Sequence, residues 1–556
     1  MTDEYVVALQ MATHPLTDDD IHELGRGTDA ALQALALAVT TGPVVTALAA
    51  LTWVENVSYS KGLIHYSEFV APILDHIVPR VPAPAVDRPL DGKDVRAVQP
   101  LIYAASTYHA LTDAIMNALK KRARAHRTVR GRVVVYPVGD ADAEQRARWF
   151  ELRWRTKREA DGQAIVPAIS ATAVAAIDAH VQSHALEIEQ RHCEVPVGNW
   201  YDQHCERIVD GALDGQFAHV HQTEVWARLS VGDIRRALRT IWMRAARRLL
   251  VHQRAMVWLR QHTGIRPDVL LTAIECVEPA DIVADFERTG LDAAAATALL
   301  ATMTRQNRGE RYPIESYPLI ALDDGRLAFA PSCILYGNWP MAQERAAART
   351  DGGRIGNVRD DRNVARVVQA LRDQFLGGHV ETEVPLRDDS GRDITDLDVA
   401  CVSADRRYVL VLQLKSFVTP LNLMDLDRAD DDIEEGLEQC RRAANRVDRV
   451  QAELEARIQV KLDPAWSLRQ CVVVEAYTGS AAPVVDLPVV SLEWLESEGV
   501  SALALGGVPE FHRRAQTLPD GRAFFDSCRP LHALVEDGEN GLTTGNSWAV
   551  WSYASE

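Results

Sequence analysis

Residues 408–415 (YVLVLQLK) constrain the fold of this chain more than any other short segment. Six of these eight residues are apolar and form an almost continuous run, which is typical of a central strand covered on both faces of a sheet. The two exceptions, Gln413 and Lys415, share one face of the predicted strand. Polar groups at the end of such a strand are costly to bury unless they meet partners. The segment therefore predicts a covered sheet with a polar site at one strand end.

The sequence on either side of this strand, from 359 to 497, predicts an α-β-β-β-α-β order, as in an α/β domain with a central mixed sheet. A first helix, capped by Asp360 or Asp361, ends at Gly377-Gly378. A long amphipathic helix follows the third strand, with the apolar stripe Ile433, Leu437, Cys440, Ala444 and Val447. The strands are expected at His379–Leu386, Ile394–Val402, Tyr408–Lys415, Gln470–Ala476 and Pro488–Leu492.

Acidic residues in the preceding strand complete the polar site. Asp396 and Asp398 are two residues apart, so they point to the same side of their strand. If the second and third strands pair as a hairpin, Asp398 lies near Gln413 and Lys415 at one edge. This set suits phosphodiester hydrolysis, because Mg²⁺ accepts carboxylate and amide oxygens and an ammonium group stabilises charge on a phosphate.

The segments ITDLDVACV and YVLVLQLKSF, with Gln413 fifteen residues after Asp398, together resemble the D-x(n)-(D/E/Q)-x-K signature of the PD-(D/E)XK nuclease superfamily. The Q-x-K form is similar to that of Mrr-like restriction endonucleases. The resemblance implies a restriction-endonuclease-like α/β fold, with Asp398 and Gln413 as ligands of Mg²⁺ or Mn²⁺ and Lys415 as the catalytic lysine. It covers residues 359–497 only.

Four further residues are expected to support this site. Asp396 lies on the same face of its strand as Asp398, the aspartate of the motif. The family often has an acid in its first helix and a glutamine in the helix after the third strand, and the resemblance assigns these positions to Asp361 and Gln439. Arg442, one turn after Gln439, would contact phosphate. Two other interpretations stay open: a buried ion pair in an ordinary α/β sheet, and an inactive nuclease fold.

The first part of the chain is dominated by helical periodicity. Helices are predicted at Ile102–Leu119, Ala168–Glu189, Val231–His262 and Ala280–Met303, and the run RVVVYPV predicts a strand. Farther along, YPLIAL-DDG-RLAFAP predicts a β-hairpin. The expected parts of this multidomain chain are a mainly helical regulatory, DNA-binding or oligomerisation region (1–305), the hairpin and a linker (306–350), the nuclease-like domain (359–497) and a C-terminal extension of unknown role (498–556).

Basic residues are unevenly distributed, although the formal net charge is −18. Residues 120–132 contain no acid, and residues 228–260 contain nine arginines and one aspartate. DNA binding depends on the local patch that meets phosphate, so both segments are candidates, and solvated helix faces are the alternative. In the second segment, Trp242 and Trp258 are expected in a core rather than as nucleobase platforms. The candidate DNA contacts are Lys120, Lys121, Arg235, Arg236 and Arg239.

Other reactive patterns are weak. The eight cysteines form no CxxC pair and several lie in apolar runs, which is typical of a reducing compartment. His192-Cys193 and His204-Cys205 favour a zinc site only weakly, because adjacent side chains diverge, and the pair His219 and His221 lacks a third ligand. No GxSxG elbow and no GK[ST] phosphate loop occur, which argues against a serine hydrolase and against ATP-driven translocation.

The N-terminal sequence predicts neither secretion nor membrane insertion. MTDEYVV lacks the basic start and the apolar run of a signal peptide. Residues 31–51 are uncharged, but Gly42-Pro43 predicts that one helix stops there and another begins. A cytoplasmic protein without a membrane partner is expected.

The sequence thus favours a cytoplasmic DNA endonuclease that depends on Mg²⁺ or Mn²⁺. A prokaryotic restriction or anti-phage role follows from the resemblance alone. The long N-terminal region predicts control by a trigger, by a partner protein or by homo-oligomerisation. The alternatives are a repair or recombination nuclease, and a catalytically inactive scaffold that binds nucleic acid or senses a trigger.

Overall fold

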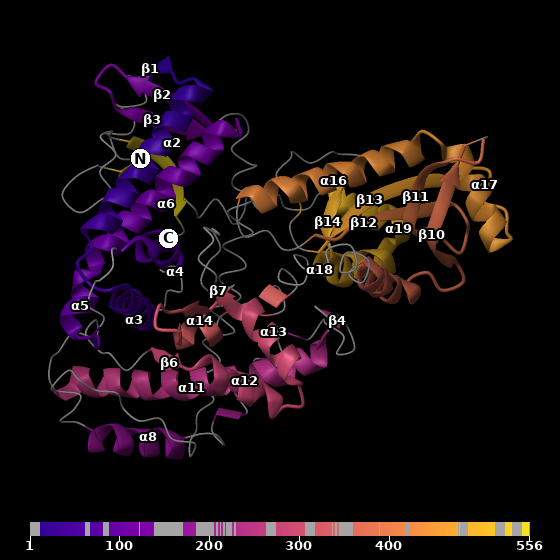
Figure 1. The fold of residues 1–556 in the computed structure, drawn as a ribbon. Helices are drawn as coiled ribbons and strands as arrows, with labels where there is room; N and C mark the ends of the chain where they lie inside the picture. Colours follow the sequence, from indigo (N-terminus) through magenta and orange to yellow (C-terminus); the bar gives the residue numbers. More distant parts are fainter. Residues whose placement is uncertain are drawn as a thin grey trace. The chain divides into compact units, whose positions relative to one another are not determined.

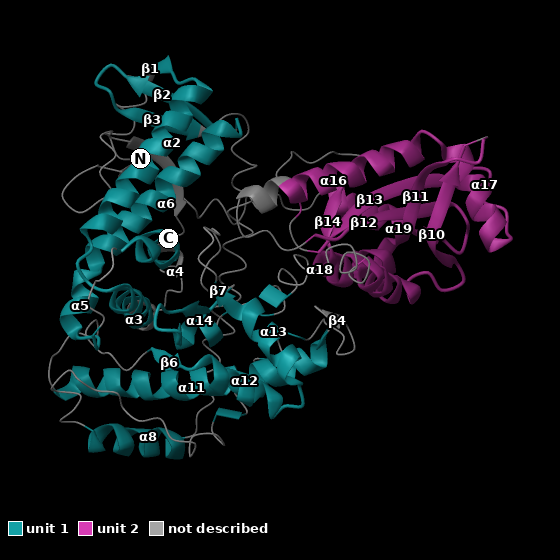
Figure 2. Ribbon diagram, viewed as in Figure 1, with its two compact units in different colours: residues 1–139, 153–346, 530–554 teal, residues 140–152, 347–529, 555–556 magenta. Residues whose placement is uncertain are grey.

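The chain folds into two compact units in the computed structural model, and each unit is described by itself (Figure 2). Unit 1 comprises Met1–Gly139, Arg153–Ala346 and Pro530–Ala554, and unit 2 comprises Asp140–Leu152, Ala347–Arg529 and Ser555–Glu556. The structure describes residues 12–61, 67–81, 88–121, 123–137, 171–184, 205–206, 209–211, 213–214, 217, 225–226, 229–262, 274–305, 317–335, 337, 339, 342–343, 360–388, 390–417, 423–475, 478, 487–516, 529–535 and 548–554.

Helices form most of unit 1, as the sequence predicted (Figure 1). The helix predicted at Val231–His262 has those bounds, whereas the one predicted at Ala280–Met303 is two helices. The reason is Gly290, whose φ of 102° lies in the left-handed region that ends a helix. The helices are α2 (Asp18–Ala38), α3 (Pro43–Lys61), α4 (Ser67–Pro72), α5 (Gly92–Ala97), α6 (Gln99–Leu119), α8 (Ala171–Ser183), α11 (Val231–His262), α12 (Pro279–Glu287), α13 (Ala293–Met303) and α14 (Pro331–Leu335).

The helix break predicted at Gly42 is present. α2 ends at Ala38, and α3 begins at Pro43, where the missing N–H of proline costs no hydrogen bond. Within the described part of the chain, no single helix has both the length and the apolar content of a membrane span, and α2 and α3 meet that criterion only as a pair bent by 109°. Both helices instead contribute to a buried cluster with α6 and α14 that includes Leu32, Leu51, Ile102, Tyr108 and Cys333.

The 32-residue helix α11 has a strongly buried apolar face. Trp242 on this face is 0% exposed, so its predicted core position is confirmed. The side chain of Arg244 on α11 forms ion pairs with Asp285 of α12 and with Glu275 of the strand Glu275–Val277. These ion pairs connect α11 to both elements. The helix is therefore built into the unit by packing and by ion pairs.

Two larger sheets complete unit 1. β3 (Val133–Pro137) lies within the predicted run RVVVYPV. β8 (Leu319–Ala321) and β9 (Leu327–Phe329) form the predicted hairpin, with Gly325 at φ 90° in its turn. β15 and β16 bring the C-terminal residues back to the first sheet, where β16 pairs in parallel with β3. The first sheet has the order β1 (Ala12–Pro15), β2 (Ala123–Thr128), β3 (Val133–Pro137), β16 (Trp548–Ala554), β15 (Arg529–Val535), and the second β6 (Glu275–Val277), β9 (Leu327–Phe329), β8 (Leu319–Ala321), β7 (Thr304–Arg305).

Unit 2 is built on one five-stranded mixed sheet, as predicted for this part of the chain. β10, β11 and β12 are antiparallel, whereas β13 and β14 run parallel to β12. Two glycines allow the first helix to turn into β10: Gly377 has a φ of 78°, and a side chain on Gly378 would lie 2.2 Å from the carbonyl oxygen of Val402. The strand order is β10 (His379–Arg387), β11 (Asp393–Val402), β12 (Tyr408–Lys415), β13 (Ser467–Val474), β14 (Val489–Ser491).

Helices cover both faces of this sheet (Figure 1). One face packs against the helix over residues 360–372, α18 (Leu492–Trp494) and α19 (Val500–Gln516). The other face packs against α16 (Leu423–Ala444) and α17 (Val447–Ile458). The alternating side chains of β12 divide between these layers, with Leu410 and Leu412 on the first and Val409 and Val411 on the second.

Two elements of unit 2 differ from the sequence prediction. The long helix breaks before Val447, so Ala444 and Val447 are exposed and Ala443 is buried instead. After residue 497, the chain continues as α19, and Phe511 of this helix is fully buried in the core. Unit 2 therefore extends beyond the predicted boundary, because the apolar face of α19 covers the sheet.

Candidate active site

Asp398 lies where β11 and β12 stop pairing as a regular ladder. The paired residues run from Val402 and Val409 to Val399 and Leu412. At the next position the carboxylate of Asp398 takes the place of a backbone acceptor: its Oδ2 receives hydrogen bonds from the backbone N–H of Leu414 (2.6 Å) and from Nε2 of Gln413 (2.8 Å). The structure thus brings Asp398 and Gln413 into contact at the end of the ladder.

The electrostatic environment of Asp398 disfavours its charged form. The pKa of this carboxyl is raised to about 7, mainly by burial and in part by the nearby Asp396 and Asp360, against the opposing effects of the N–H of Leu414 and the ammonium of Lys415. The carboxyl therefore binds a proton or a cation more readily than an exposed aspartate does. Perturbed carboxyls of this kind are common at catalytic and metal sites.

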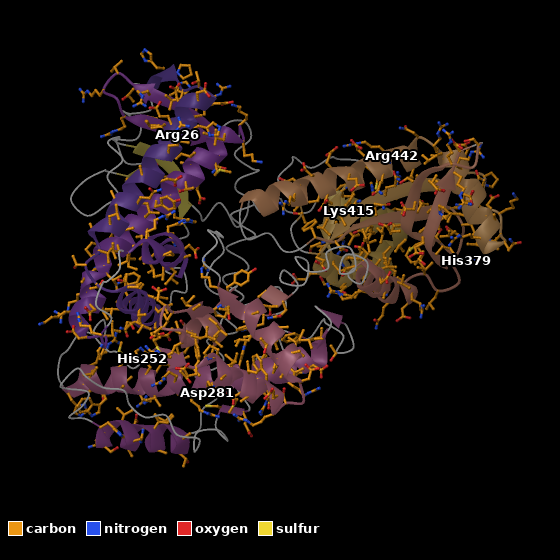
Figure 3. The ribbon with its side chains drawn as sticks, viewed as in Figure 1. Arg26, His252, Asp281, His379, Lys415 and Arg442 are labelled. Atoms are coloured by element: carbon orange, nitrogen blue, oxygen red, sulfur yellow. The ribbon has the colours of Figure 1, made fainter. Side chains whose placement is uncertain are left out.

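Lys415 ends β12 on the same face as Gln413. Its side chain is 15% exposed, and its Nζ lies 3.1 Å from Oε2 of Glu435 on α16. Gly436 makes this approach possible, because a Cβ there would lie 3.1 Å from Cγ and 3.3 Å from Cε of Lys415. The backbone of α16 therefore fixes the path of the lysine side chain, and Figure 3 shows Lys415 at the strand beneath this helix.

A second polar cluster lies at the same strand ends on the other face of the sheet. Ser416 follows β12 and Glu475 follows β13, and Nδ2 of Asn363 donates to Oγ of Ser416 (2.8 Å) and to Oε1 of Glu475 (3.0 Å). Arg362 also binds Glu475, at 2.7 Å. These bonds fix the N-terminal part of the first helix against the ends of β12 and β13, beside the position of Asp360.

The expected supporting residues have different positions. Asp396 is an exposed neighbour of Asp398, and Gln439 is partly buried, with its Oε1 buried and unbonded among the described residues. Arg442 is exposed and pairs with Glu438 of its own helix (Figure 3). Asp361 is exposed, and Asp360, one residue earlier, is the first-helix acid that acts on Asp398.

The basic residues expected to bind DNA belong to unit 1, and most of them pair with acids there. Arg239 binds Asp210 at 2.6 Å. Arg235 pairs with Asp214, and Arg236 with Asp233. Lys121 pairs with Asp18, and Lys120 is exposed. The paired charges are locally compensated, which reduces the attraction that these residues offer to a phosphate backbone.

The donor set at Asp398 fits a hard divalent cation better than a zinc ion. No three His, Cys, Asp or Glu side chains in the described ranges converge to hold a metal on their own. Oδ1 of Asp398 and Oε1 of Gln413 receive no hydrogen bond from a described residue and are oxygen donors that Mg²⁺ or Mn²⁺ accepts together with water. Of the two His-Cys pairs, only Cys205 is described, and both His219 and His221 lie outside the described residues.

Comparison of the chain with protein-family models, with curated proteins and with solved structures found no match. The site is therefore interpreted from its own geometry.

Several residues of the site escaped the sequence prediction. Glu435 and Gly436 lie on α16. The sequence does not show which residues of α16 face β12, because packing over the whole sheet sets the position of the helix. Asn363 and Glu475 are separated by more than one hundred residues, and only the parallel pairing of β12 and β13 brings them together. The one sequence signal was Glu475, a charged residue directly after the apolar run CVVV.

Proposed function

We propose that unit 2 is a phosphodiesterase of the PD-(D/E)XK type that cleaves DNA and depends on Mg²⁺ or Mn²⁺. The observation that supports this most is the contact of a partly buried carboxyl with an amide, near a lysine, where β11 and β12 stop pairing. Asp398 and Gln413 are in contact, and Lys415 is close enough to lower the pKa of Asp398. An ordinary buried ion pair would not need the third polar group.

Each side chain has a distinct task in this proposal. Asp398, through Oδ1, and Gln413, through its amide oxygen, would hold the divalent ion, which supplies a Lewis acid for the phosphate. The ammonium of Lys415 donates hydrogen bonds to a phosphate oxygen and stabilises the negative charge that develops during attack by water. The N–H of Leu414 keeps the Asp398 carboxylate in place, and Gly436 and Glu435 direct the lysine.

Unit 1 is assigned a controlling role in this proposal. A nuclease that acted without restraint would damage the DNA of its own cell, and the prokaryotic restriction or anti-phage context rests on the motif resemblance alone. The trigger, a partner protein or self-association would act through this unit. A repair or recombination nuclease would act on a different substrate from a restriction nuclease, since it would cleave DNA ends or DNA junctions rather than intact duplex.

The direct test is cleavage of supercoiled plasmid and linear DNA by the full-length protein with Mg²⁺, Mn²⁺ or EDTA. We expect metal-dependent products that fall by roughly 100-fold or more in Asp398→Asn and in Lys415→Ala. Arg441→Ala is the matched control, because Arg441 is a partly exposed cation on α16 paired with Glu434 and has no assigned role at the site. Equal activity of all four proteins would refute the catalytic assignment, and DNA binding without cleavage in any condition would favour the inactive scaffold.

A further inference from the structure

The ammonium of Lys415 is surrounded by more acidic groups than it can neutralise. It lowers the pKa of Asp398 and of Asp432, and it forms an ion pair with Glu435. One carboxylate is thus paired with this ammonium, and two further carboxyl groups lie within its electrostatic influence. A phosphate approaching Lys415 meets repulsion from them unless one carboxylate moves away or loses its charge.

These three acids differ in their freedom to move. Asp398 is held by the N–H of Leu414 and by Gln413. Asp432, one turn before Gly436 on α16, is half-buried, and burial raises the pKa of its carboxyl. The side chain of Glu435 is 58% exposed, and Lys415 is its one partner among the residues that the structure describes.

The lysine, in contrast, is fixed. Its aliphatic part lies against Gly436, and a Cβ at that glycine would also meet Val472 at 3.2 Å, so helix and strand are in close contact there. The Glu435 end of this ion pair is exposed to solvent, and an ion pair at the surface contributes only about 0–1 kcal/mol, so a stronger anion can replace it. When an anion arrives, Glu435 can therefore leave toward solvent while Lys415 keeps its position.

Other acids of α16 have a different arrangement. Glu434 pairs with Arg441 at 2.6 Å, and Glu438 pairs with Arg442 at 3.4 Å, so both are neutralised within the helix. Glu435 is neutralised by a strand residue at the site itself. Its charge consequently bears on ligand binding at Lys415, whereas that of Glu434 does not.

We propose that Glu435 is a displaceable counter-ion of Lys415, which an incoming phosphate group of the substrate replaces. This inference rests on the proposed function, because it assigns a phosphate to Lys415. Glu435 then determines how tightly the site holds a phosphate: it occupies the ammonium when no substrate is present, and it opposes weak or singly charged anions. Release of Glu435 accompanies binding, and no covalent step is involved.

The test uses a short fluorescein-labelled DNA duplex and fluorescence anisotropy, with full-length protein in EDTA so that no cleavage takes place. Removing one screened charge beside a phosphate changes affinity by about threefold to tenfold. We expect Glu435→Gln to bind the duplex tighter by this factor and Glu434→Gln, with the same charge change on the neighbouring residue, to bind like the wild type. The gain should disappear in the double variant Glu435→Gln with Lys415→Ala.

Three results would overturn the inference: equal gains in Glu435→Gln and Glu434→Gln, a gain that persists without Lys415, or unchanged or weaker binding in Glu435→Gln. Cleavage with Mg²⁺ adds an independent readout, in which Glu435→Gln should lower the KM for DNA. A loss of kcat at unchanged affinity would instead make Glu435 part of the catalytic set. If the wild type never cleaves DNA but the variants bind the duplex as expected, the counter-ion role of Glu435 is supported and the proposed enzymatic function is refuted.

Discussion

Glu55 in unit 1 is fully buried and Asp398 in unit 2 is partly buried, and burial is the main reason that the pKa of each is raised to about 7. Their surroundings differ. Glu55 lies beside the large apolar cluster of unit 1 and accepts hydrogen bonds from the N–H (3.0 Å) and the hydroxyl (2.6 Å) of Ser332, so it joins α3 to the start of α14. Asp398 lies at the end of a strand ladder beside Lys415 and further acids.

The difference shows that a perturbed pKa does not by itself identify a functional site. A buried carboxyl that bonds only to the backbone and a hydroxyl of its own unit stabilises the packing of two helices. Each carboxyl has one oxygen that accepts both of its hydrogen bonds, but Asp398 contacts an amide side chain and has a lysine nearby, which is the composition of a reactive site. This comparison makes four predictions.

The largest expected effect concerns catalysis. Asp398→Asn should lower metal-dependent DNA cleavage by roughly 100-fold or more, whereas Glu55→Gln should leave the cleavage rate of folded protein within about twofold of the wild type. Both substitutions replace an ionisable carboxyl by a neutral amide of nearly the same shape. The measurement is plasmid nicking by proteins shown to be folded by circular dichroism, and similar losses in both variants would remove the distinction between the two acids.

The next effect is on stability and pH. The pKa of Glu55 in the folded chain is about 7, above its usual 4.5, so the folded state holds the proton over this range. The contribution of Glu55 to the unfolding free energy is fully present below about pH 4.5. It is lost as the pH rises through 7, and the total loss is about 3 kcal/mol. Glu55→Gln cannot titrate, so its stability should fall less over the same range. Calorimetric unfolding across this range measures the difference, and parallel curves would show that Glu55 does not titrate as proposed.

A smaller effect is expected at Gly436. Alanine has the higher helix propensity by about 1 kcal/mol, but its Cβ would lie 3.1 Å from Lys415 and 3.2 Å from Val472. Overpacking of this kind costs about 1–3 kcal/mol, so Gly436→Ala should lower the unfolding free energy by about 1 kcal/mol and reduce cleavage by displacing Lys415. Urea unfolding and nicking assays test both effects, and a stabilised, fully active variant would show that the helix is not in close contact with the lysine.

Gly27 in α2 supplies the matched control and the smallest effect. A Cβ at this position meets no atom within 4 Å. Gly27→Ala should therefore stabilise the protein by about 0.5–1 kcal/mol through helix propensity alone and leave cleavage unchanged. The same urea unfolding series measures this change, and destabilisation would indicate a constraint on α2 that its packing does not reveal.

Local patterns sufficed for the secondary structure of the sheet in unit 2. β12 has the bounds that its apolar run predicted, and the shared face of Gln413 and Lys415 follows from the alternation of a strand. The break between α2 and α3 likewise followed from Gly42 and Pro43. In these segments a local rule decides the conformation. The apolar pattern of residues 408–415 is compatible with a strand, and the restricted φ of Pro43 is compatible with the start of a helix.

Segments whose partners are distant in sequence were not predictable in this way. The strands near the C-terminus, β15 and β16, complete a sheet begun by β1, β2 and β3, more than three hundred residues earlier. α19 belongs to unit 2 only because its apolar face covers the sheet there. Sequence periodicity gives the face of an element but not the surface on which that face is buried.

The candidate site shows the same division. The sequence alone determined which strand residues can act together, because Asp398, Gln413 and Lys415 are fixed by strand alternation and by the pairing of neighbouring strands. The tertiary structure alone decided that Asp360 rather than Asp361 acts on Asp398, that Glu435 pairs with Lys415, and that Arg442 pairs with Glu438. The physical reason is that helix positions over a sheet depend on the packing of many side chains at once, whereas strand alternation depends on the backbone.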